Sequence, residues 1–232
     1  MTQDSPPTTQ KDPTPTGGSG GTAWIRLFIG VVFVVMVAGV TSYLLRDRTT
    51  TGVVGPAGLV VDYSDSFDRY SGGLDEGRAG DRWIVRRGGW SVAAGAAYVS
   101  RPVAGDNVAV VEVGPYVAVR AQVSGLGRCG IIADLDDGGS LSLVRVEKFG
   151  VWNLQRQKDG TLESLASVPG SKNNSLPVSI VVEPPIVTAE VGDKSVSVSV
   201  PGLEPRGAAG FLAADPDPEG CAFDELVISG DD

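Results

Sequence analysis

The side chains that most often carry enzyme chemistry are scarce in this sequence. It contains no histidine and only two cysteines, Cys129 and Cys221. The lack of histidine excludes Ser-His-Asp and Cys-His nucleophilic sites, a histidine general base and histidine metal ligands. Two cysteines are also too few for a zinc site built from thiolates. In a domain outside the cytosol they predict one disulfide, and two buried free thiols are the alternative.

Carboxylates are the next candidates, either for acid–base chemistry or for calcium. Asp215, Asp217 and Glu219 alternate with prolines, which a ladder strand does not tolerate, so they lie in a loop and not on a glycosidase strand. This loop is a solvated acidic turn or a weak calcium site, because calcium prefers carboxylate and carbonyl oxygens. Asp134 and Asp136, at a predicted hairpin, allow the same two interpretations.

Planar polar side chains beside a tryptophan are the feature that could bind sugar. Trp152 is followed by Asn153 and Gln155, and further polar residues lie on neighbouring predicted strands, namely Arg120, Gln122, Arg145 and Glu147. If Arg145, Asn153 and Gln155 face a concave sheet surface, Trp152 points into the core, and a register shift of one residue reverses this. We favour a core tryptophan. The alternating polar residues are by themselves typical of any solvated sheet face.

The element that precedes these residues is an apolar segment, residues 27–45, which carries no charge. As a helix it would be about 28 Å long, close to the roughly 30 Å hydrocarbon core of a bilayer. We therefore predict a transmembrane helix over 23–45, with a buried core helix as the alternative. The run is longer than the apolar region of a signal peptide and no A-x-A site follows it, which favours a signal anchor over a cleaved leader.

Composition divides the rest of the chain. Residues 1–22 are rich in Pro, Thr, Gly and Ser and predict a disordered tail, and 46–61 predict a linker. The formal charge of −9 is uneven: residues 1–26 sum to 0 and 46–59 to +1, which leaves −10 for 60–232. This acidity argues against nucleic acid as a partner and against close docking on anionic lipid headgroups.

Residues 62–232 show the pattern of an all-β domain. The segments 116–123 and 195–200 alternate apolar and polar residues, and turn pairs such as Gly138-Gly139 and Asp159-Gly160 separate the apolar runs. A period of two with frequent turns predicts an antiparallel sandwich of two sheets. The predicted strands are 62–67, 83–87, 89–93, 96–100, 107–113, 116–124, 128–135, 140–147, 150–158, 161–168, 176–183, 186–191, 194–200, 207–214 and 221–229.

The order of these features resembles the concanavalin A-like, laminin-G-type jelly rolls, and among them the 3-keto-disaccharide-hydrolase-type lectin domains. The resemblance covers about 62–229. It rests on these segments: DSFDR (65–69), WIVRRGGWSV (83–92), CGIIAD (129–134), SLVRV (142–146), WNLQR (152–156), DGTLESLA (159–166), VSIVVE (178–183), GAAGFLAA (207–214) and FDELVI (223–228).

The resemblance implies two curved sheets of six or seven strands, with the first and last strands adjacent and a concave face that often holds sugar. Related jelly rolls often bind calcium beside the paired end strands, and Asp68 and Asp224 would be the positions here. The alternative is that these two aspartates accept hydrogen bonds from local backbone groups. Fold alone does not assign an activity.

The leading functional prediction is a non-catalytic carbohydrate-binding or adhesion module. Glycan of the cell envelope is the expected ligand, with no cofactor other than a possible calcium ion. The alternatives are a glycoside hydrolase of the same fold and a structural accessory subunit whose span recruits a membrane-protein partner. Positive charge is nearly balanced across the span, so the positive-inside rule does not fix the orientation. From the cysteine pair and the lectin-type domain we predict a single-pass protein of the cell membrane, with a cytoplasmic N-terminus and an extracellular domain.

Overall fold

The computed structural model describes residues 60–68, 71–74, 82–135, 137–146, 150–170, 175–215 and 217–230. These residues lie within one compact unit, Gly52–Asp232. Within the described part of the chain, no helix is long and apolar enough to cross a membrane. The predicted tail, the predicted transmembrane segment 23–45 and nearly all of the predicted linker lie outside the described residues and stay predictions.

The described residues form strands almost throughout. The strands are β1 (Val60–Asp65), β2 (Gly72–Gly73), β3 (Trp83–Arg87), β4 (Gly89–Ala93), β5 (Ala96–Arg101), β6 (Asn107–Val113), β7 (Ala118–Gly125), β8 (Arg128–Leu135), β9 (Ser140–Arg145), β10 (Val151–Lys158), β11 (Thr161–Pro169), β12 (Ser175–Glu183), β13 (Ile186–Val191), β14 (Lys194–Ser199), β15 (Pro205–Ala214) and β16 (Cys221–Gly230). Every strand predicted from the sequence is present, with its ends displaced by at most a few residues. The sequence pattern missed β2 and the short 3-10 helix η2 (Pro218–Gly220), because each is too short to show a period.

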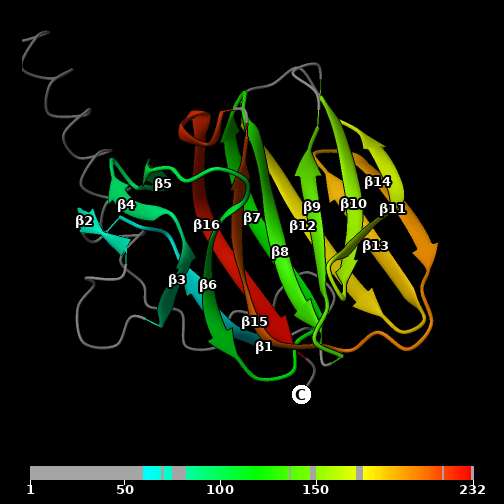
Figure 1. Ribbon diagram of the computed structural model, residues 1–232. Helices are drawn as coiled ribbons and strands as arrows, with labels where there is room; N and C mark the ends of the chain where they lie inside the picture. The colour runs from blue at the N-terminus through cyan, green and yellow to red at the C-terminus, as the bar shows by residue number, and fades with distance from the viewer. Residues whose placement is uncertain are drawn as a thin grey trace, which may run out of the picture. The chain divides into compact units, whose positions relative to one another are not determined.

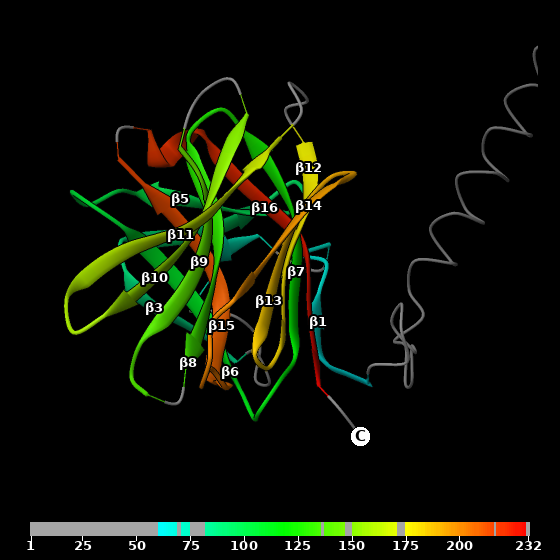
Figure 2. The same ribbon diagram turned by 90° about the vertical axis from the view of Figure 1, so that its right-hand side faces the viewer.

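Two antiparallel sheets pack face to face as a sandwich (Figure 1). A 9-stranded sheet has the order β14-β13-β12-β7-β16-β5-β4-β2, with β1 paired to β16 off this path. A 7-stranded sheet has the order β11-β10-β9-β8-β15-β6-β3. Figure 2 shows β1, β7 and β13 on one side of the sandwich and β8, β9 and β15 on the other. The first and last strands are adjacent, as the jelly-roll resemblance implies, but one sheet is larger than expected because β1 and β2 extend it.

Period-two alternation directs the inward side chains of both sheets into one core. In β7, Val119, Ala121 and Val123 are buried, as the sequence pattern predicts, while Arg120 and Gln122 are only half-buried. A residue's face in a strand changes with every step along the chain, so this pattern fixes which side chains meet between the sheets. The two strands β8 and β15 depart from it, because nearly all their residues are buried on both faces.

Aromatic rings fill the core at one part of the sandwich. Phe211 of β15 lies 4.6 Å from Phe223 and 5.1 Å from Trp83, measured between ring centroids. Phe67 and Trp90 lie 5.8 Å and 6.4 Å from the same ring. Phe211 is therefore the shared neighbour of four rings that come from both sheets and from the turn after β1.

The sequence of the β4–β5 hairpin, GGWSVAAGAAYVS (88–100), predicts that its aromatic residues pack in the core, and the structure confirms this for Trp90 and corrects it for Tyr98. Trp90 is 2% exposed and packs in the core, and its indole N–H donates to the carbonyl of Arg87 over 3.1 Å. Tyr98 was expected in the core but is only half-buried. Its neighbours Ala97 and Val99 take the inward positions, so alternation turns Tyr98 to the outer face.

Asp65, in the first segment of the resemblance, is a buried carboxylate that organises its surroundings. It is 2% exposed and accepts hydrogen bonds from the backbone N–H of Phe67 at 2.9 Å and from the indole of Trp83 at 3.1 Å. The hydroxyl of Tyr63 donates to it over 3.3 Å. A buried carboxylate with several donors is stable in the interior, and here it fixes the turn that delivers Phe67 to the aromatic cluster.

The predicted disulfide is confirmed. Cys129 at the start of β8 and Cys221 at the start of β16 are bonded, with a sequence separation of 92 residues. Both sulfur-bearing residues are 1% exposed. The bond links the 7-stranded sheet to the 9-stranded sheet, so it closes a long loop and crosses the sandwich.

Candidate functional site

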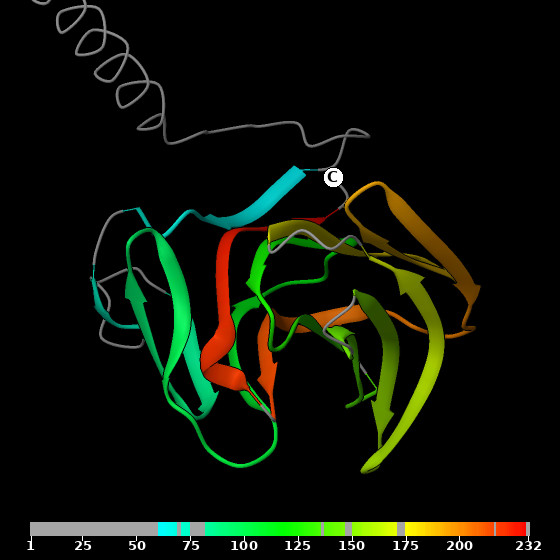
Figure 3. The same ribbon diagram turned by 90° about the horizontal axis from the view of Figure 1, so that it is seen from above.

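The outer face of the 7-stranded sheet is the concave surface of the domain. Its centre carries Val110, Ile132, Val144 and Leu212, which point away from the sandwich core yet are only 0–7% exposed. Side chains on a flat open face would be far more exposed, so neighbouring groups must close over them. Viewed from above, the β10–β11 hairpin and the loop leading into β6 extend beyond the central strands on this side (Figure 3).

Two glycines allow the strands of this floor to lie close together. A Cβ atom at Gly210 would collide with the carbonyl oxygen of Ala109, and one at Gly130 would collide with the carbonyl oxygen of Leu143. Both glycines face outward, next to Val110, Ile132 and Leu212 in the register of the sheet. A larger residue at either position would push the neighbouring strands apart, so both positions require glycine.

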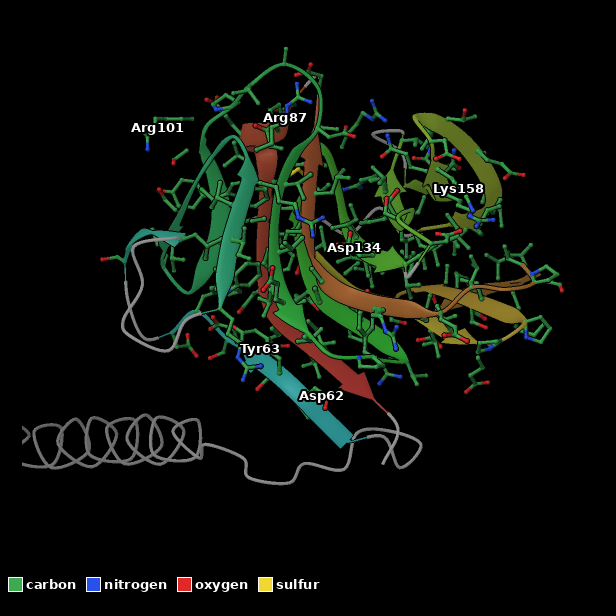
Figure 4. The ribbon with its side chains drawn as sticks, turned by 60° about the horizontal axis from the view of Figure 1, so that its bottom comes forward. Asp62, Tyr63, Arg87, Arg101, Asp134 and Lys158 are labelled. Carbon is green, nitrogen blue, oxygen red and sulfur yellow. A yellow bond between two sulfur atoms is a disulfide. The ribbon has the colours of Figure 1, made fainter. Side chains whose placement is uncertain are left out.

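A groove of about 590 Å³ crosses this face. Its walls and floor come from the end of β3, the start of β6, strands β8 to β10, and the two turns that join β8 to β9 and β10 to β11. The lining residues are Arg86, Arg87, Asp106, Val108, Ile132, Asp134, Gly138, Gly139, Ser140, Gln157, Lys158, Asp159 and Gly160. Figure 4 shows Asp134 between Arg87 and Lys158, with Asp62 and Tyr63 on β1 outside this group.

An ion pair fixes one wall of the groove. Arg86 of β3 donates from Nη1 to Asp134 Oδ1 over 3.0 Å and from Nη2 to Asp134 Oδ2 over 2.5 Å. This bidentate contact raises the pKa of Arg86, and the nearby charge of Glu112 adds to the effect. The two residues are 48 positions apart in sequence, and the pair bridges β3 to β8 over the two strands between them.

Tyr116, just before β7, forms hydrogen bonds to the strands that lie beneath the groove. Its hydroxyl lies 3.1 Å from the carbonyl oxygen of Asp134 and 3.0 Å from that of Ala208, and these two acceptors share its single hydrogen. Burial raises the pKa of the Tyr116 phenol above its ordinary value, so the group stays protonated and remains a donor. The hydroxyl therefore ties β8 to β15 beneath the groove.

Asp137 fixes the opposite wall. Its Oδ2 accepts from Arg156 Nη2 and from Lys158 Nζ, each over 2.7 Å, and its Oδ1 accepts from the backbone N–H of Gly139 over 3.1 Å. The carboxylate thus joins the β8–β9 turn to the end of β10. The hydrogen bond from Lys158 is the main cause that lowers the pKa of Asp137 below its ordinary range.

Because its pKa is lowered in the folded chain, Asp137 should stabilise the fold only while it is ionised. The contribution is fully present above the unfolded-state pKa of about 3.9 and is lost as the pH falls through the lower folded-state value. Asp137→Asn should lower the free energy of unfolding at pH 7 by less than about 1 kcal/mol, since the residue is exposed and solvent screens its ion pairs. Denaturant titrations at pH 7 and in acid measure both effects.

Asp193→Asn is the matched control for this prediction. Asp193 lies in the β13–β14 turn of the other sheet and also accepts from a lysine, Lys194, over 3.0 Å. That ion pair joins two residues that are adjacent in sequence and brings no distant segments together, so its loss should change stability still less. Equal effects of the two substitutions would contradict the role given to Asp137.

The groove offers hydrogen-bonding groups around a small apolar floor. Ser140 and Gln157 present neutral donors and acceptors, while Val108 and Ile132 supply apolar contact. No aromatic side chain is among the described residues that line the groove, although aromatic faces are a common platform for sugar rings. Recognition here would depend on polar groups already held in place by ion pairs.

Two of the predicted ligand-binding residues lie on the same face as the groove. Asn153 and Gln155 of β10 are half-buried and point outward, opposite Val144 and Ser142 of β9. Neither lines the groove itself, and the Asn153 side chain accepts from Ser167 Oγ over 2.8 Å. Their orientation is the one expected if Trp152 belongs to the core.

Two others lie on the opposite face of the molecule. Arg120 and Gln122 belong to β7 in the 9-stranded sheet, and Gln122 donates to Ser175 Oγ over 2.6 Å. They therefore cannot act in one site with Asn153 and Gln155. The sequence placed all four on alternating strands but carried no information on which strands share a sheet.

Arg145 and Trp152 require a correction. They are opposite each other in the β9–β10 register and both point inward, at 3% and 1% exposed. The core position of Trp152 is the one we favoured, but Arg145 was expected on the same face as Asn153 and Gln155. It follows Leu141 and Leu143 on the inner face of β9 instead. Glu147 lies outside the described residues.

The described residues contain no group of three or more acidic, cysteine or histidine side chains that could hold a metal ion. Asp134 is engaged by Arg86, Asp68 is exposed, and Asp224 is half-buried and accepts from the backbone N–H of Glu225 over 2.7 Å. Asp136 lies outside the described residues. Calcium binding at these positions stays a prediction.

The acidic loop between β15 and β16 is built as a turn. Asp217 begins η2 and accepts from the backbone N–H of Gly220 over 3.2 Å. Asp215 accepts from the backbone N–H of Gly105 over 2.7 Å, and Glu219 is exposed. Asp215 and Asp217 thus satisfy backbone donors, as the structural interpretation of this loop expects.

Sequence reasoning missed most of the residues that line the groove. Arg86, Asp106, Gln157 and Lys158 come from segments that are far apart in sequence, and each alone looks like an ordinary solvated side chain. The turn pairs Gly138-Gly139 and Asp159-Gly160 were recognised as hairpins. If these two turns had been known to lie close together, they would have indicated the groove. Their proximity depends on the pairing of β9 with β10, which the sequence does not show.

Comparison with known proteins gives matches to solved structures only. No protein-family model matches the chain, and the curated proteins contain no match. A non-specific endo-beta-1,3(4)-glucanase of family GH16 is similar with a TM-score of 0.55 at 9% identity, over 76% of this chain and 93% of that chain. A protein of unknown function with a galectin-like fold from Bacillus subtilis has a TM-score of 0.52 at 13% identity, over 73% and 95%.

A third similar structure is the CBM2 module of the evolved Dit protein of Lactobacillus casei BL23 phage J-1. It has a TM-score of 0.50 at 11% identity and covers 73% of this chain and 94% of that chain. At such identities the similarity shows the fold alone. It agrees with the two antiparallel sheets described here and supports a sandwich of the concanavalin A-like type.

Proposed function

We propose that this protein is a glycan-binding module whose ligand lies in the groove on the outer face of the 7-stranded sheet. The observation that carries the proposal is the groove itself, about 590 Å³ in volume, on the concave face of the domain. The fold is shared with a glucanase and with a module from a phage Dit protein. Sugar on a concave face is also what the jelly-roll resemblance implies.

The lining suits a neutral, hydroxyl-rich ligand. Ser140 and Gln157 can exchange hydrogen bonds with sugar hydroxyls, and the C–H surface of a sugar ring can rest on Val108 and Ile132. The Arg86–Asp134 and Lys158–Asp137 ion pairs fix the charged side chains of the groove walls in the free protein, before a ligand binds. Groups already fixed in place lose less conformational entropy on binding, which strengthens a site without aromatic contacts.

A binding role fits this site better than hydrolysis. A retaining glycosidase needs two carboxyl groups about 5–5.5 Å apart, one of them available as an acid. Asp134 is engaged by both Nη atoms of Arg86. The other carboxylates among the described lining residues, Asp106 and Asp159, come from the segment before β6 and from the β10–β11 turn, which lie near opposite edges of the sheet.

The proposal includes a membrane anchor. The uncharged segment 27–45 has the length of a bilayer-spanning helix, and a Thr- and Gly-rich linker follows it. With the domain outside the cell, the linker would separate a net charge of −10 from the lipid headgroups, and the disulfide would form in an oxidising compartment. Envelope glycan would then be within reach of the groove.

Substitution of one glutamine on each face tests where the glycan binds. Gln157→Ala should weaken binding about 3- to 10-fold, since one hydrogen bond is worth about 0.5–1.5 kcal/mol. Gln122→Ala, on the outer face of the other sheet, should leave the affinity unchanged. Calorimetric titration of the full chain with soluble glucan, mannan and galactan oligosaccharides measures both, in a detergent whose headgroup contains no sugar.

The outcomes separate the three functions considered. Binding that Gln122→Ala weakens and Gln157→Ala does not would move the site to the 9-stranded sheet. Turnover of the oligosaccharides would favour the hydrolase. No binding to any glycan would favour a structural accessory subunit over a lectin.

A further inference from the structure

Two residues inside the sandwich carry three buried hydrogen-bond donors that have no acceptor among the described residues. The donors are Nε and Nη2 of Arg145 and Nε1 of Trp152. The two residues are directly opposite each other in the β9–β10 register and are 3% and 1% exposed. Nearly all buried polar groups in folded proteins are hydrogen-bonded, so three exceptions on two paired strands indicate a missing acceptor.

The geometry of the guanidinium narrows the kind of acceptor. Nη1 of Arg145 already donates to the carbonyl oxygen of Gly125, the last residue of β7. The free atoms Nε and Nη2 form the side edge of the guanidinium plane, where two N–H groups point in parallel. This edge matches the two oxygens of a carboxylate, which binds arginine bidentately.

The charge of Arg145 also favours an anionic acceptor. No ion pair of Arg145 is found among the described residues, and burial alone lowers its pKa. A buried cation without a counter-charge is strongly unfavourable. Ordered water could accept the hydrogen bonds, but it would leave the charge uncompensated.

We propose that Arg145 and Trp152 form a binding site for a small carboxylate anion, of the size of formate or acetate, at the end of the sandwich where β9 ends and β10 begins. One oxygen accepts from Nε and the other from Nη2 of Arg145, and one of them also accepts from the Trp152 indole. The site is inside the sandwich and is separate from the groove, so it does not depend on the proposed glycan ligand.

The indole N–H signals provide a direct test in the full-length chain. The sequence has four tryptophans, and the indoles of Trp83 and Trp90 already donate to Asp65 and to the carbonyl of Arg87. Sodium formate should move the Trp152 indole signal downfield in a spectrum of ¹⁵N-tryptophan-labelled protein, and sodium chloride at equal ionic strength should not. The signal is assigned by its loss in Trp152→Phe, which keeps an aromatic ring in the core.

Thermal unfolding supplies a second measurement. Formate should raise the Tm by about 2–4 °C at concentrations well above its Kd, because it binds only the folded chain. Arg145→Met should abolish this shift, and Arg145→Lys, which keeps the charge but not the parallel N–H groups, should reduce it. Arg120→Met is the matched control, since Arg120 also has an unpartnered Nε but lies on an outer face and should keep the full response.

Three results would overturn the proposal. The first is a Trp152 signal that does not respond to formate or acetate in the unsubstituted protein, which needs no variant to fold. The second is a Trp152 signal that changes in Glu147→Gln without any added anion, because the acceptor would then belong to the chain itself. A response to chloride as large as that to formate would likewise rule out a site specific for carboxylate.

Discussion

Replacing Phe211 by alanine should lower the free energy of unfolding by about 3–5 kcal/mol, the usual effect of truncating a buried aromatic ring. Phe211 is 0% exposed and contacts four other rings, with Phe223 at 4.6 Å and Trp83 at 5.1 Å between centroids. The loss combines the hydrophobic transfer of the ring with the cavity left among neighbours from both sheets. Denaturant titration followed by tryptophan fluorescence measures it.

Two further substitutions serve as controls for this prediction. Phe211→Leu should have a smaller effect, because the leucine side chain fills part of the cavity. Leu162→Ala, at a site that is 58% exposed, should change stability by less than about 0.5 kcal/mol. If Phe211→Ala behaved like Leu162→Ala, the aromatic cluster would not be the centre of the core.

Removing the disulfide should have the second large effect. Replacing Cys129 and Cys221 together by alanine should lower the free energy of unfolding by about 2–5 kcal/mol, since the bond closes a loop whose ends are 92 residues apart. In the chain-entropy model such a loop restricts the unfolded chain strongly. Titration of the double variant with urea, beside the unsubstituted protein, gives the difference.

The effect of the double variant should also be seen on reduction. Unfolding the unsubstituted protein in dithiothreitol should give a midpoint close to that of the variant, because both lack the same cross-link. Dithiothreitol should not change the midpoint of the variant itself. A double variant as stable as the oxidised protein would show that the loop closure contributes little here.

The groove depends on contacts that no single element supplies. Arg86 reaches Asp134 from the edge strand β3, and Asp137 joins the β8–β9 turn to Lys158 of β10. Between these walls, Gly130 and Gly210 allow the backbones of neighbouring strands to approach each other closely. The proposed glycan site is therefore a product of curvature and of long-range ion pairs, and its walls should respond to changes in either.

The interior pair of Arg145 and Trp152 is a separate feature. A cation on the inner face of β9 conflicts with the apolar pattern of Leu141 and Leu143, which lie on the same face of that strand. Departures from local pattern are expected where a protein does something besides fold. Binding of a carboxylate anion by the unpartnered donors would explain why a charged residue occupies this position, and the experiments above test it.

Alternation and turn residues were sufficient to locate the strands. A period of two and glycine-rich turns depend only on residues close in sequence, and they placed segments such as β7 and β10 nearly correctly. The pairing of Cys129 with Cys221 also followed from the sequence, because a chain with two cysteines has one intramolecular choice. The uncharged segment 27–45 is likewise a property of sequence alone.

Which strands became neighbours, and which face became concave, was decided only in the folded chain. Arg120 and Asn153 have similar local patterns but lie on opposite outer faces, because β7 and β10 belong to different sheets. Arg145 points inward because its strand pairs it with Trp152 and its guanidinium reaches the carbonyl of Gly125 on the other sheet. These outcomes depend on contacts between residues far apart in sequence, and a local sequence pattern does not indicate which distant residues will become partners.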